Sequence, residues 1–580
     1  MGHAGRYRLA LALLLLGPLW WAGIATRSVW KPDEPREYAL SVNMLVQPQR
    51  AVPLLADSPF AEKPPLTYWA AAAAMHVFGP SPAVARIPNL LYGLVTVLCT
   101  AWLAAALVPR GDASKVAASV ALVVSGTAWL NFLHTIWLAT DAPLLAASAV
   151  ATLGAWLGAT ATKRSDRWRG YALFHCGLTA AFMAKNVLGL IAPVMALGLF
   201  AVWDGRWREL LRAPLWLGLA IPAIVIGSWI HAVAAQPDGA RLLHVFLWDN
   251  SVGRFLPVES SGDYRNGHLN SPGKLVTEVA AGLLPWLFAA LASLWFTLRA
   301  AFGPDRALAS AMRFLLCASL PLIALLSFSS TVRDVYALPS MVALTAMIGV
   351  WWAHQGAGTA GGVAVPLTRA LLWLSGLLAW ALALAVPWLA DRWSLGGAAG
   401  GTCAAIMFVC LCWSAVRLAK DLPIFQGLVV FCSGIFAAFW LASPIIERAQ
   451  DLRPTAMRAA SIAQGRPLLL GAGDETMAAA LDYATDAVGL MTADLEQAWR
   501  TRPRALALVE TGSDPLDETM RARLESAWPW ASRRIRATQE PLARSLRDAG
   551  WTIIVDLPIP GGRHYQLFTP PQAQSIPPAP

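Results

Sequence analysis

Long apolar runs separated by short basic loops dominate this chain of 580 residues. Hydrophobic residues make up 57% of the sequence and charged residues only 14%, whereas an ordinary soluble domain has about 25% charged residues. Many of the runs approach the length of about 20 residues that a helix needs to cross a bilayer. The pattern therefore predicts an α-helical polytopic membrane protein.

We predict about 13 spanning helices. They are expected near residues 9–25, 86–108, 116–133, 141–160, 170–184, 187–203, 214–234, 276–298, 314–328, 335–353, 369–389, 397–416 and 424–442. Loops rich in Lys and Arg fall on one side of this alternation, which the positive-inside rule assigns to the cytoplasm. The first run has no small-residue cleavage site, so we expect an uncleaved span rather than a signal peptide. The N-terminus is then cytoplasmic and the C-terminus lies outside.

The spans divide the chain into two expected domains. Residues 1–442 form a transmembrane domain with long extracytoplasmic loops at 26–85 and 235–275. From about residue 443 the long apolar runs give way to short apolar segments. This pattern predicts an outer α/β domain at residues 443–580 that ends in a disordered tail rich in Pro and Gln. Its expected strands lie at 467–471, 505–510 and 551–556, and its expected helices at 474–485, 516–526 and 539–549.

Composition also argues against several functions. The net charge of +10 comes largely from short basic loops, so we expect membrane anchoring and no nucleic-acid binding. All seven Cys residues lie inside apolar runs and indicate neither a disulfide framework nor a zinc finger. The stretch from Gly471 to Asp474 ends a strand but lacks the full dinucleotide fingerprint, so no nucleotide is expected.

Two charged clusters stand out in the first outer loop: Asp33-Glu34-Pro35-Arg36 and Glu62-Lys63-Pro64-Pro65. Each lies at the start of a predicted surface helix, one running to Val46 and one to Phe78, with the apolar face on the membrane. Free N–H groups at a helix start favour anions, and Glu34 is expected to be a cap. Arg and Lys suit phosphate.

These residue types suit group transfer at a membrane surface. Outside the cytoplasm a donor must carry its own activation, as a polyprenyl-phosphate sugar does. Arg and Lys can stabilise the leaving phosphate, and a carboxylate can accept a proton from an attacking hydroxyl. The clusters therefore favour a lipid-borne phosphate as ligand.

The order of motifs resembles that of GT-C glycosyltransferases related to protein O-mannosyltransferases, and within them the family that transfers aminoarabinose to bacterial lipid A. The two clusters are followed by matching segments at Arg86 and Pro88, 140–144, 184–189, 250–286 and 327–339. The chain departs from the pattern at Ala184 and Asn186, and has Arg333 where the family has Lys. The resemblance implies a GT-C fold, an inner-membrane location and a periplasmic C-terminal domain.

The resemblance also implies roles for individual residues. The implied catalytic carboxylates are Asp33 and, supporting a loop near the site, Asp141. The implied substrate-binding residues are Arg36, Lys63, Lys185, Arg254, Arg333 and Tyr336. A divalent metal (Zn, or Mg or Mn) is implied at Glu62 and His268, although stable zinc sites usually have three or four protein ligands.

We therefore expect an inverting glycosyltransferase that moves a sugar from a polyprenyl-phosphate donor to an envelope acceptor. The resemblance implies 4-amino-4-deoxy-L-arabinose as the sugar and lipid A as the acceptor. Within the same reaction class the alternatives are O-antigen, another glycan or a protein. A lipid-linked substrate transporter or flippase is the alternative of another class, but it predicts an internal repeat and more mid-span charges. A scaffold whose outer domain recruits partners leaves the charged clusters unexplained.

Overall fold

The computed structural model describes residues 16–251, 273–355 and 451–571, with gaps at 57, 330–331, 472, 493, 512–539 and 560–562, and scattered residues between 402 and 450. Before residue 252 the elements are α2 (Glu34–Val46), β1 (Leu54–Leu55), β2 (Ser58–Pro59), α3 (Leu66–Phe78), α4 (Pro82–Ala106), α5 (Asp112–Thr127), α6 (Trp129–Ile136), α7 (Asp141–Thr160), α8 (Arg164–Lys185), α9 (Leu188–Trp203), η1 (Trp207–Leu211), α10 (Ala213–Leu217), α11 (Ala220–Ala234), α12 (Gly239–His244) and η2 (Val245–Asp249). The next group is α13 (Lys274–Gly282), α14 (Leu287–Ala300), α15 (Arg306–Leu326), η6 (Asp334–Ala337) and α16 (Leu338–His354).

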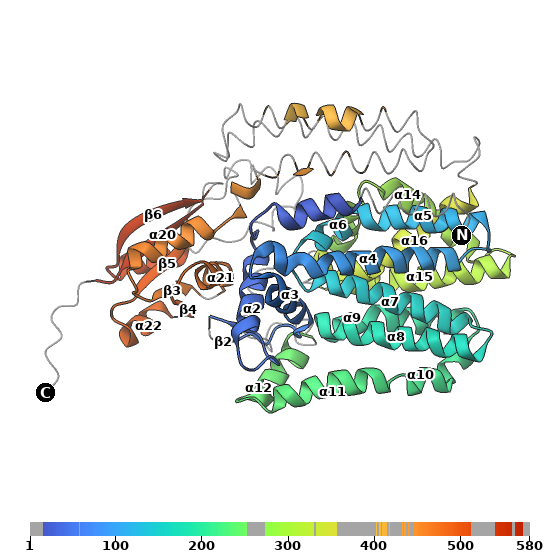
Figure 1. The fold of residues 1–580 in the computed structure, drawn as a ribbon, viewed down its shortest axis with the longest axis horizontal. Helices are drawn as coiled ribbons and strands as arrows, with labels where there is room; N and C mark the ends of the chain where they lie inside the picture. Colours follow the sequence, from blue (N-terminus) through green and yellow to red (C-terminus); the bar gives the residue numbers. More distant parts are fainter. Residues whose placement is uncertain are drawn as a thin grey trace.

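These helices form an elongated bundle (Figure 1). In the described part of the chain, five helices are long and apolar enough to cross a membrane, or up to seven if each of two bent pairs is one span. The bent pairs are α5 with α6, at 62°, and α13 with α14, at 112°. The chain is thus a multi-pass helical membrane protein. The expected spans near 369–389, 397–416 and 424–442 lie wholly or mostly outside the described residues.

Small residues let α7 and α8 pack closely. A Cβ added at Gly170 of α8 would stand 2.3 Å from the backbone nitrogen of Gly158 in α7. A Cβ at Gly177 would likewise lie 2.4 Å from the backbone nitrogen of Ala151. Helices in lipid gain stability from such close contact because apolar burial between them adds little. The contact fixes the end of α8 relative to the start of α7, where two expected site residues lie.

The C-terminal part is a five-stranded sheet with the strand order β4-β3-β5-β7-β6. Its elements are α20 (Arg453–Ala463), β3 (Leu468–Gly471), α21 (Glu475–Ala484), β4 (Gly489–Thr492), α22 (Leu495–Thr501), β5 (Leu506–Thr511), α24 (Glu540–Asp548), β6 (Thr552–Ile559) and β7 (Arg563–Thr569). The strands β3, β5 and β6 confirm the three predicted ones, whereas β4 and β7 lack the continuous apolar run that predicts a buried strand. The helix expected at 516–526 lies outside the described residues.

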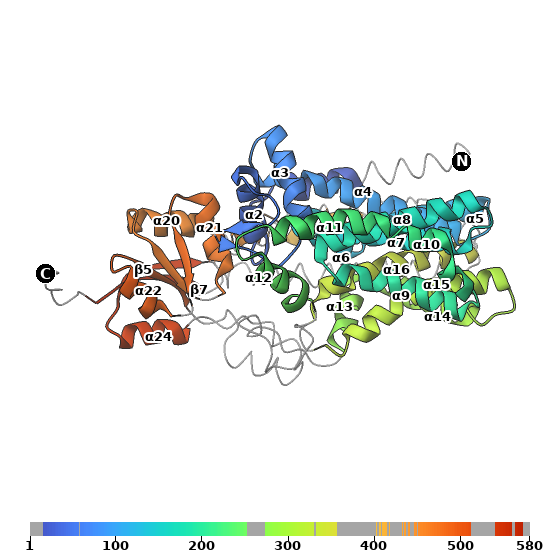
Figure 2. The ribbon, with the colours of Figure 1, turned by 90° about the horizontal axis from the view of Figure 1, so that it is seen from below.

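The α/β domain sits at one end of the bundle, against α2 (Figures 1 and 2). Tyr38 of α2 packs edge-on against Tyr483 of α21, with ring centroids 5.2 Å apart. Asn43 donates to Asp482 at 2.7 Å, and the hydroxyl of Thr476 donates to the carbonyl oxygen of Pro32 at 3.0 Å. The predicted surface helices do form, but the Tyr38 face of α2 meets a protein domain rather than lipid.

Candidate active site

Asp33 precedes α2 with its carboxylate turned toward cations. The side chain caps no backbone N–H of the helix. Instead, Arg333 donates to one carboxylate oxygen at 2.6 Å, and Arg36 reaches the other at 3.4 Å. Burial raises the pKa of Asp33, but the charges of Arg333, Arg36 and Lys63 outweigh it and hold that pKa well below its usual range. The surrounding cations therefore favour the ionised form of this carboxyl group.

Glu34 is a buried ion-pair centre, so its expected role as a cap is wrong. Its carboxylate pairs with Arg27 and accepts a hydrogen bond from Nε of Arg86 at 2.7 Å. It also accepts from the backbone N–H groups of Trp30, at 2.8 Å, and Leu138, at 2.9 Å. Burial opposes its ionisation, yet the two guanidinium groups lower its pKa to about 2. Glu34 thereby ties the start of α2 to α4 and to the turn before α7.

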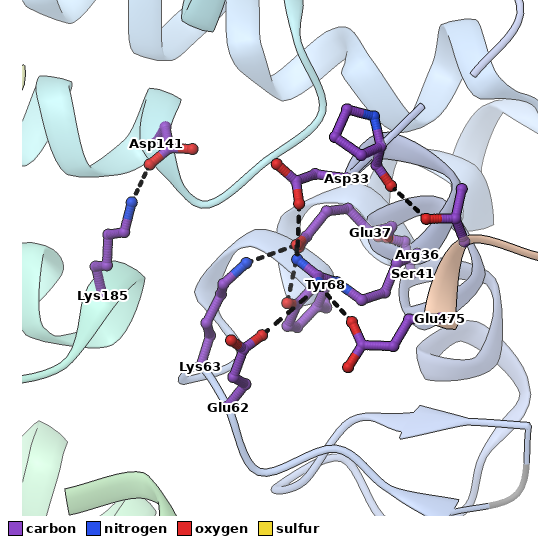
Figure 3. Close-up of polar contacts among 12 residues, drawn as sticks. Asp33, Arg36, Glu37, Ser41, Glu62, Lys63, Tyr68, Asp141, Lys185 and Glu475 are labelled. Atoms are coloured by element: carbon purple, nitrogen blue, oxygen red, sulfur yellow. Dashed lines mark hydrogen bonds and ion pairs between the residues drawn. The ribbon is translucent and has the colours of Figure 1, made fainter. Parts of the chain in front are cut away.

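Glu37 lies at the centre of a group of charged side chains that we call the Arg36 cluster, and sequence reasoning missed it. The cluster consists of Asp33, Arg36, Glu37, Glu62, Lys63 and Arg333. Its side chain is fully buried. It accepts hydrogen bonds from Lys63 Nζ at 2.7 Å, Tyr68 Oη at 2.8 Å and Arg36 Nη2 at 3.0 Å (Figure 3). Glu37 follows Asp33 by four residues, the spacing that places two side chains on one face of a helix. That spacing was the signal that could have found it.

Arg36 gathers carboxylates from three parts of the chain. Besides Asp33 and Glu37 on its own helix, it lies 3.9 Å from Glu62. Its Nη1 donates to Glu475 of α21 at 2.5 Å (Figure 3). These charges raise the pKa of Arg36 well above its usual value against the opposing effect of burial. Glu475 belongs to the C-terminal domain, so the site is built by both domains.

Asp141 and Lys185 form a second ionic group. Asp141 opens α7, Lys185 closes α8, and their side chains form a buried ion pair. The Lys185 ammonium lies 5.1 Å from the ring centroid of Tyr336. Figure 3 shows this pair to one side of the Arg36 cluster. The structure therefore brings these three predicted residues together.

A small cavity joins the two ionic groups. It has a volume of about 20 Å³ and is lined by residues of both groups, Glu62 and Lys63 on one side and Lys185 and Tyr336 on the other. Eight of the ten predicted site residues thus lie in one connected region. Arg254 and His268 lie outside the described residues.

The predicted metal lacks support within the described residues. No group of three or more His, Cys, Asp or Glu side chains there could hold a metal ion. Glu62 lies 3.9 Å from Arg36 and next to Lys63 in sequence, so a metal at Glu62 would face like charge. His268, the second predicted ligand, lies outside the described residues, so the metal stays a prediction and we route no chemical step through it.

A much larger, mostly apolar cavity of about 880 Å³ is lined by residues of α2, α3, α8 and α11. Its wall includes Trp69, Met183 and Trp229. Arg50 and His76 are the basic residues of the lining. The cavity has the size and polarity of a site for an apolar ligand.

Comparison with known proteins shows what this chain is similar to. The family model of dolichyl-phosphate-mannose-protein mannosyltransferases matches residues 62–231. A similar curated protein, the undecaprenyl phosphate-alpha-4-amino-4-deoxy-L-arabinose arabinosyl transferase of Erwinia tasmaniensis, is 28% identical over 370 residues. That match covers 62% of this chain and 60% of the relative, so the chain spans about three fifths of the relative's length.

Two solved structures share the fold. ArnT from Cupriavidus metallidurans bound to undecaprenyl phosphate superposes with a TM-score of 0.70 at 17% identity, covering 96% of this chain and 97% of that one. The Archaeoglobus fulgidus oligosaccharyltransferase tethered to an acceptor peptide gives a TM-score of 0.51 at 11% identity, covering 97% and 74%. The predicted resemblance is confirmed: this chain shares the helical fold of ArnT and is similar in sequence to named aminoarabinose arabinosyl transferases.

Proposed function

We propose that this protein is an inverting glycosyltransferase. It moves 4-amino-4-deoxy-L-arabinose from a polyprenyl-phosphate donor to lipid A. The observation that carries the proposal is the ionised carboxylate of Asp33 inside a cluster of three cations, Arg36, Lys63 and Arg333. Such a cluster suits a reaction in which a phosphate leaves and positive charge develops on a sugar. The similarity to named arabinosyl transferases supports the choice of sugar and donor.

The chemistry breaks one bond and forms one bond at the anomeric carbon of the sugar. The bond to the donor phosphate breaks, and polyprenyl phosphate leaves with the electron pair. An acceptor oxygen attacks from the opposite face. Arg36 and Lys63 stabilise the leaving phosphate by charge-assisted hydrogen bonds. Asp141 and Lys185 hold the neighbouring wall of the site.

Asp33 acts by electrostatics in this scheme. A carboxylate whose pKa is held well below its usual range is a weak proton acceptor. A phosphate acceptor is already ionised near neutral pH and needs no base. The negative charge of Asp33 instead stabilises the positive charge that develops on the sugar ring.

The location and the donor's lipid follow from the same proposal. The protein lies in the bacterial inner membrane with a cytoplasmic N-terminus, and the α/β domain is periplasmic. The apolar cavity of about 880 Å³ is large enough for part of a prenyl chain. A divalent metal at Glu62 and His268 is a separate proposal. Removal of metal with a chelator tests it, and full transfer by a metal-free sample would contradict it.

Mass spectrometry of envelope lipids tests the proposed function. Cells that produce the wild-type protein should contain lipid A with the added mass of aminoarabinose, and cells that lack it should not. Cells with the Asp33→Asn variant, present at the wild-type level, should match the cells that lack the protein. A sugar-sized mass on O-antigen, another glycan or a protein would keep the reaction and replace the acceptor. Unmodified lipids in every sample would contradict the function.

A further inference from the structure

Every cation of the Arg36 cluster already contacts a carboxylate. Arg333 contacts Asp33, Lys63 contacts Glu37, and Arg36 contacts Asp33, Glu37 and Glu475. Arg binds carboxylates and phosphates through the same N–H groups. An incoming phosphate must therefore compete with a carboxylate that the protein itself supplies.

The four carboxylates around Arg36 differ in how readily they can leave. Glu37 is fully buried and held by Tyr68, and the Glu62 side chain is 8% exposed. Glu475 is 22% exposed, and its bond to Arg36 crosses from one domain to the other. Asp33, which is 24% exposed, lies 3.4 Å from Arg36 and is held by a second cation, Arg333, at 2.6 Å. The geometry thus marks Glu475 as the carboxylate that gives way.

The position of Glu475 on α21 fits such a role. It lies in the first turn of the helix, where a negative charge is favourable whether or not Arg36 contacts it. Asp474, Thr476 and Asp482 anchor the same helix through other bonds, to Tyr565, Pro32 and Asn43. The Glu475 side chain can therefore turn away while α21 stays docked.

We propose that Glu475 occupies the phosphate-binding edge of Arg36 in the donor-free site and sets the affinity for the donor by competing with its phosphate. This inference rests on the proposed function, because it takes a polyprenyl phosphate as the ligand of Arg36. It gives the C-terminal domain a direct part in donor binding. The residue is a determinant of donor affinity and not a catalytic group.

The test measures equilibrium binding of undecaprenyl phosphate to the purified full-length protein in lipid nanodiscs. Glu475→Gln removes the competing charge and should tighten binding by roughly 2- to 5-fold, the effect of losing one partly exposed ion pair. Glu475→Asp keeps the charge on a shorter side chain and should give an intermediate affinity. The matched control is Asp482→Asn on the same helix, whose partner is Asn43, and it should bind as the wild type does.

A thermodynamic cycle separates competition from a change in fold. In an Arg36→Ala background the Glu475→Gln change should have no effect on affinity, because the contested group is gone. Unchanged or weaker binding by Glu475→Gln, with wild-type protein that binds, contradicts this inference alone. If neither protein binds undecaprenyl phosphate above the level of empty nanodiscs, the proposed function fails and the inference fails with it.

Discussion

At the scale of single residues, the site depends on buried charges that satisfy one another. Asp33, Arg36, Glu62 and Lys63 were predicted from two short motifs, because charges at helix starts in an apolar chain are conspicuous. Glu37 was missed since its neighbours in sequence already accounted for the motif. Glu475 could not be predicted, because it lies 439 residues from Arg36 and only the fold brings the two together.

Glu37 offers a test of this charge balance. The Glu37→Gln change leaves Lys63 and Arg36 with one anion fewer in a buried place, and should lower the free energy of unfolding by about 2–4 kcal/mol. It should also weaken binding of undecaprenyl phosphate, because both cations lose their common support. Thermal unfolding and binding of the purified protein measure the two effects. Glu496→Gln, which removes an exposed ion pair with Arg500, is the control and should change neither. Wild-type stability in Glu37→Gln would contradict the central role of this group.

The low pKa of Asp33 makes a prediction about acid stability. In the unfolded chain the group has a pKa of about 3.9, above its value in the folded protein. Ionised Asp33 therefore adds stability above about pH 4, and this contribution is lost as the pH falls toward the folded pKa. Thermal unfolding between about pH 7 and pH 3 should show a steeper acid loss for the wild type than for Asp33→Asn. Asp112→Asn, at an exposed site, should follow the wild type. Parallel curves for all three proteins would show that Asp33 is not held ionised by the fold.

At the scale of elements, the length of the apolar runs predicts the helices, and the charged segments between them predict the loops. The expected spans at 141–160 and 187–203 match α7 and α9 within one residue at each end. The bends between α5 and α6 and between α13 and α14 were not predicted, because hydropathy gives no information about the direction in which a helix runs. The close contact of α7 and α8 depends on which glycines face each other, and the sequence alone does not pair them.

Adding one methyl group tests that contact. Gly170→Ala places a Cβ against the backbone of α7 and should destabilise the protein by about 1–3 kcal/mol. Gly198→Ala in α9 is the matched control, since a Cβ there meets nothing within 4 Å. It should be neutral or stabilising by up to about 1 kcal/mol. Thermal unfolding in one detergent compares the two variants. Equal stability of the Gly170→Ala and Gly198→Ala variants would mean that α7 and α8 can move apart at no cost in free energy.

At the scale of the whole molecule, the chain combines a membrane bundle with an α/β domain docked on its end. The hydropathy pattern predicted both parts, because a long apolar region gives way to short predicted strands and helices near residue 443. It did not predict that α21 would contact α2. That contact depends on shape and on paired side chains such as Tyr38 and Tyr483, which have no signature in sequence.

The proposed topology can be checked with reporter fusions in whole bacterial cells. Alkaline phosphatase, which folds only outside the cytoplasm, should be active when fused after residue 571. The same enzyme fused within 204–212 should be inactive, because the positive-inside rule places that loop in the cytoplasm. A green fluorescent protein that requires the cytoplasm should give the opposite pattern. Activity at 204–212 and none after 571 would invert the proposed orientation.

The bond between Arg36 and Glu475 also has a consequence for how the protein is made. Arg36 enters the membrane system early in translation, whereas Glu475 emerges only after the spans between them have been synthesised. Until then Arg36 lacks the carboxylate that, under the inference above, competes with phosphate for it. A newly made chain should therefore keep the phosphate-binding edge of Arg36 open until its last domain has folded, and docking of that domain should then close it.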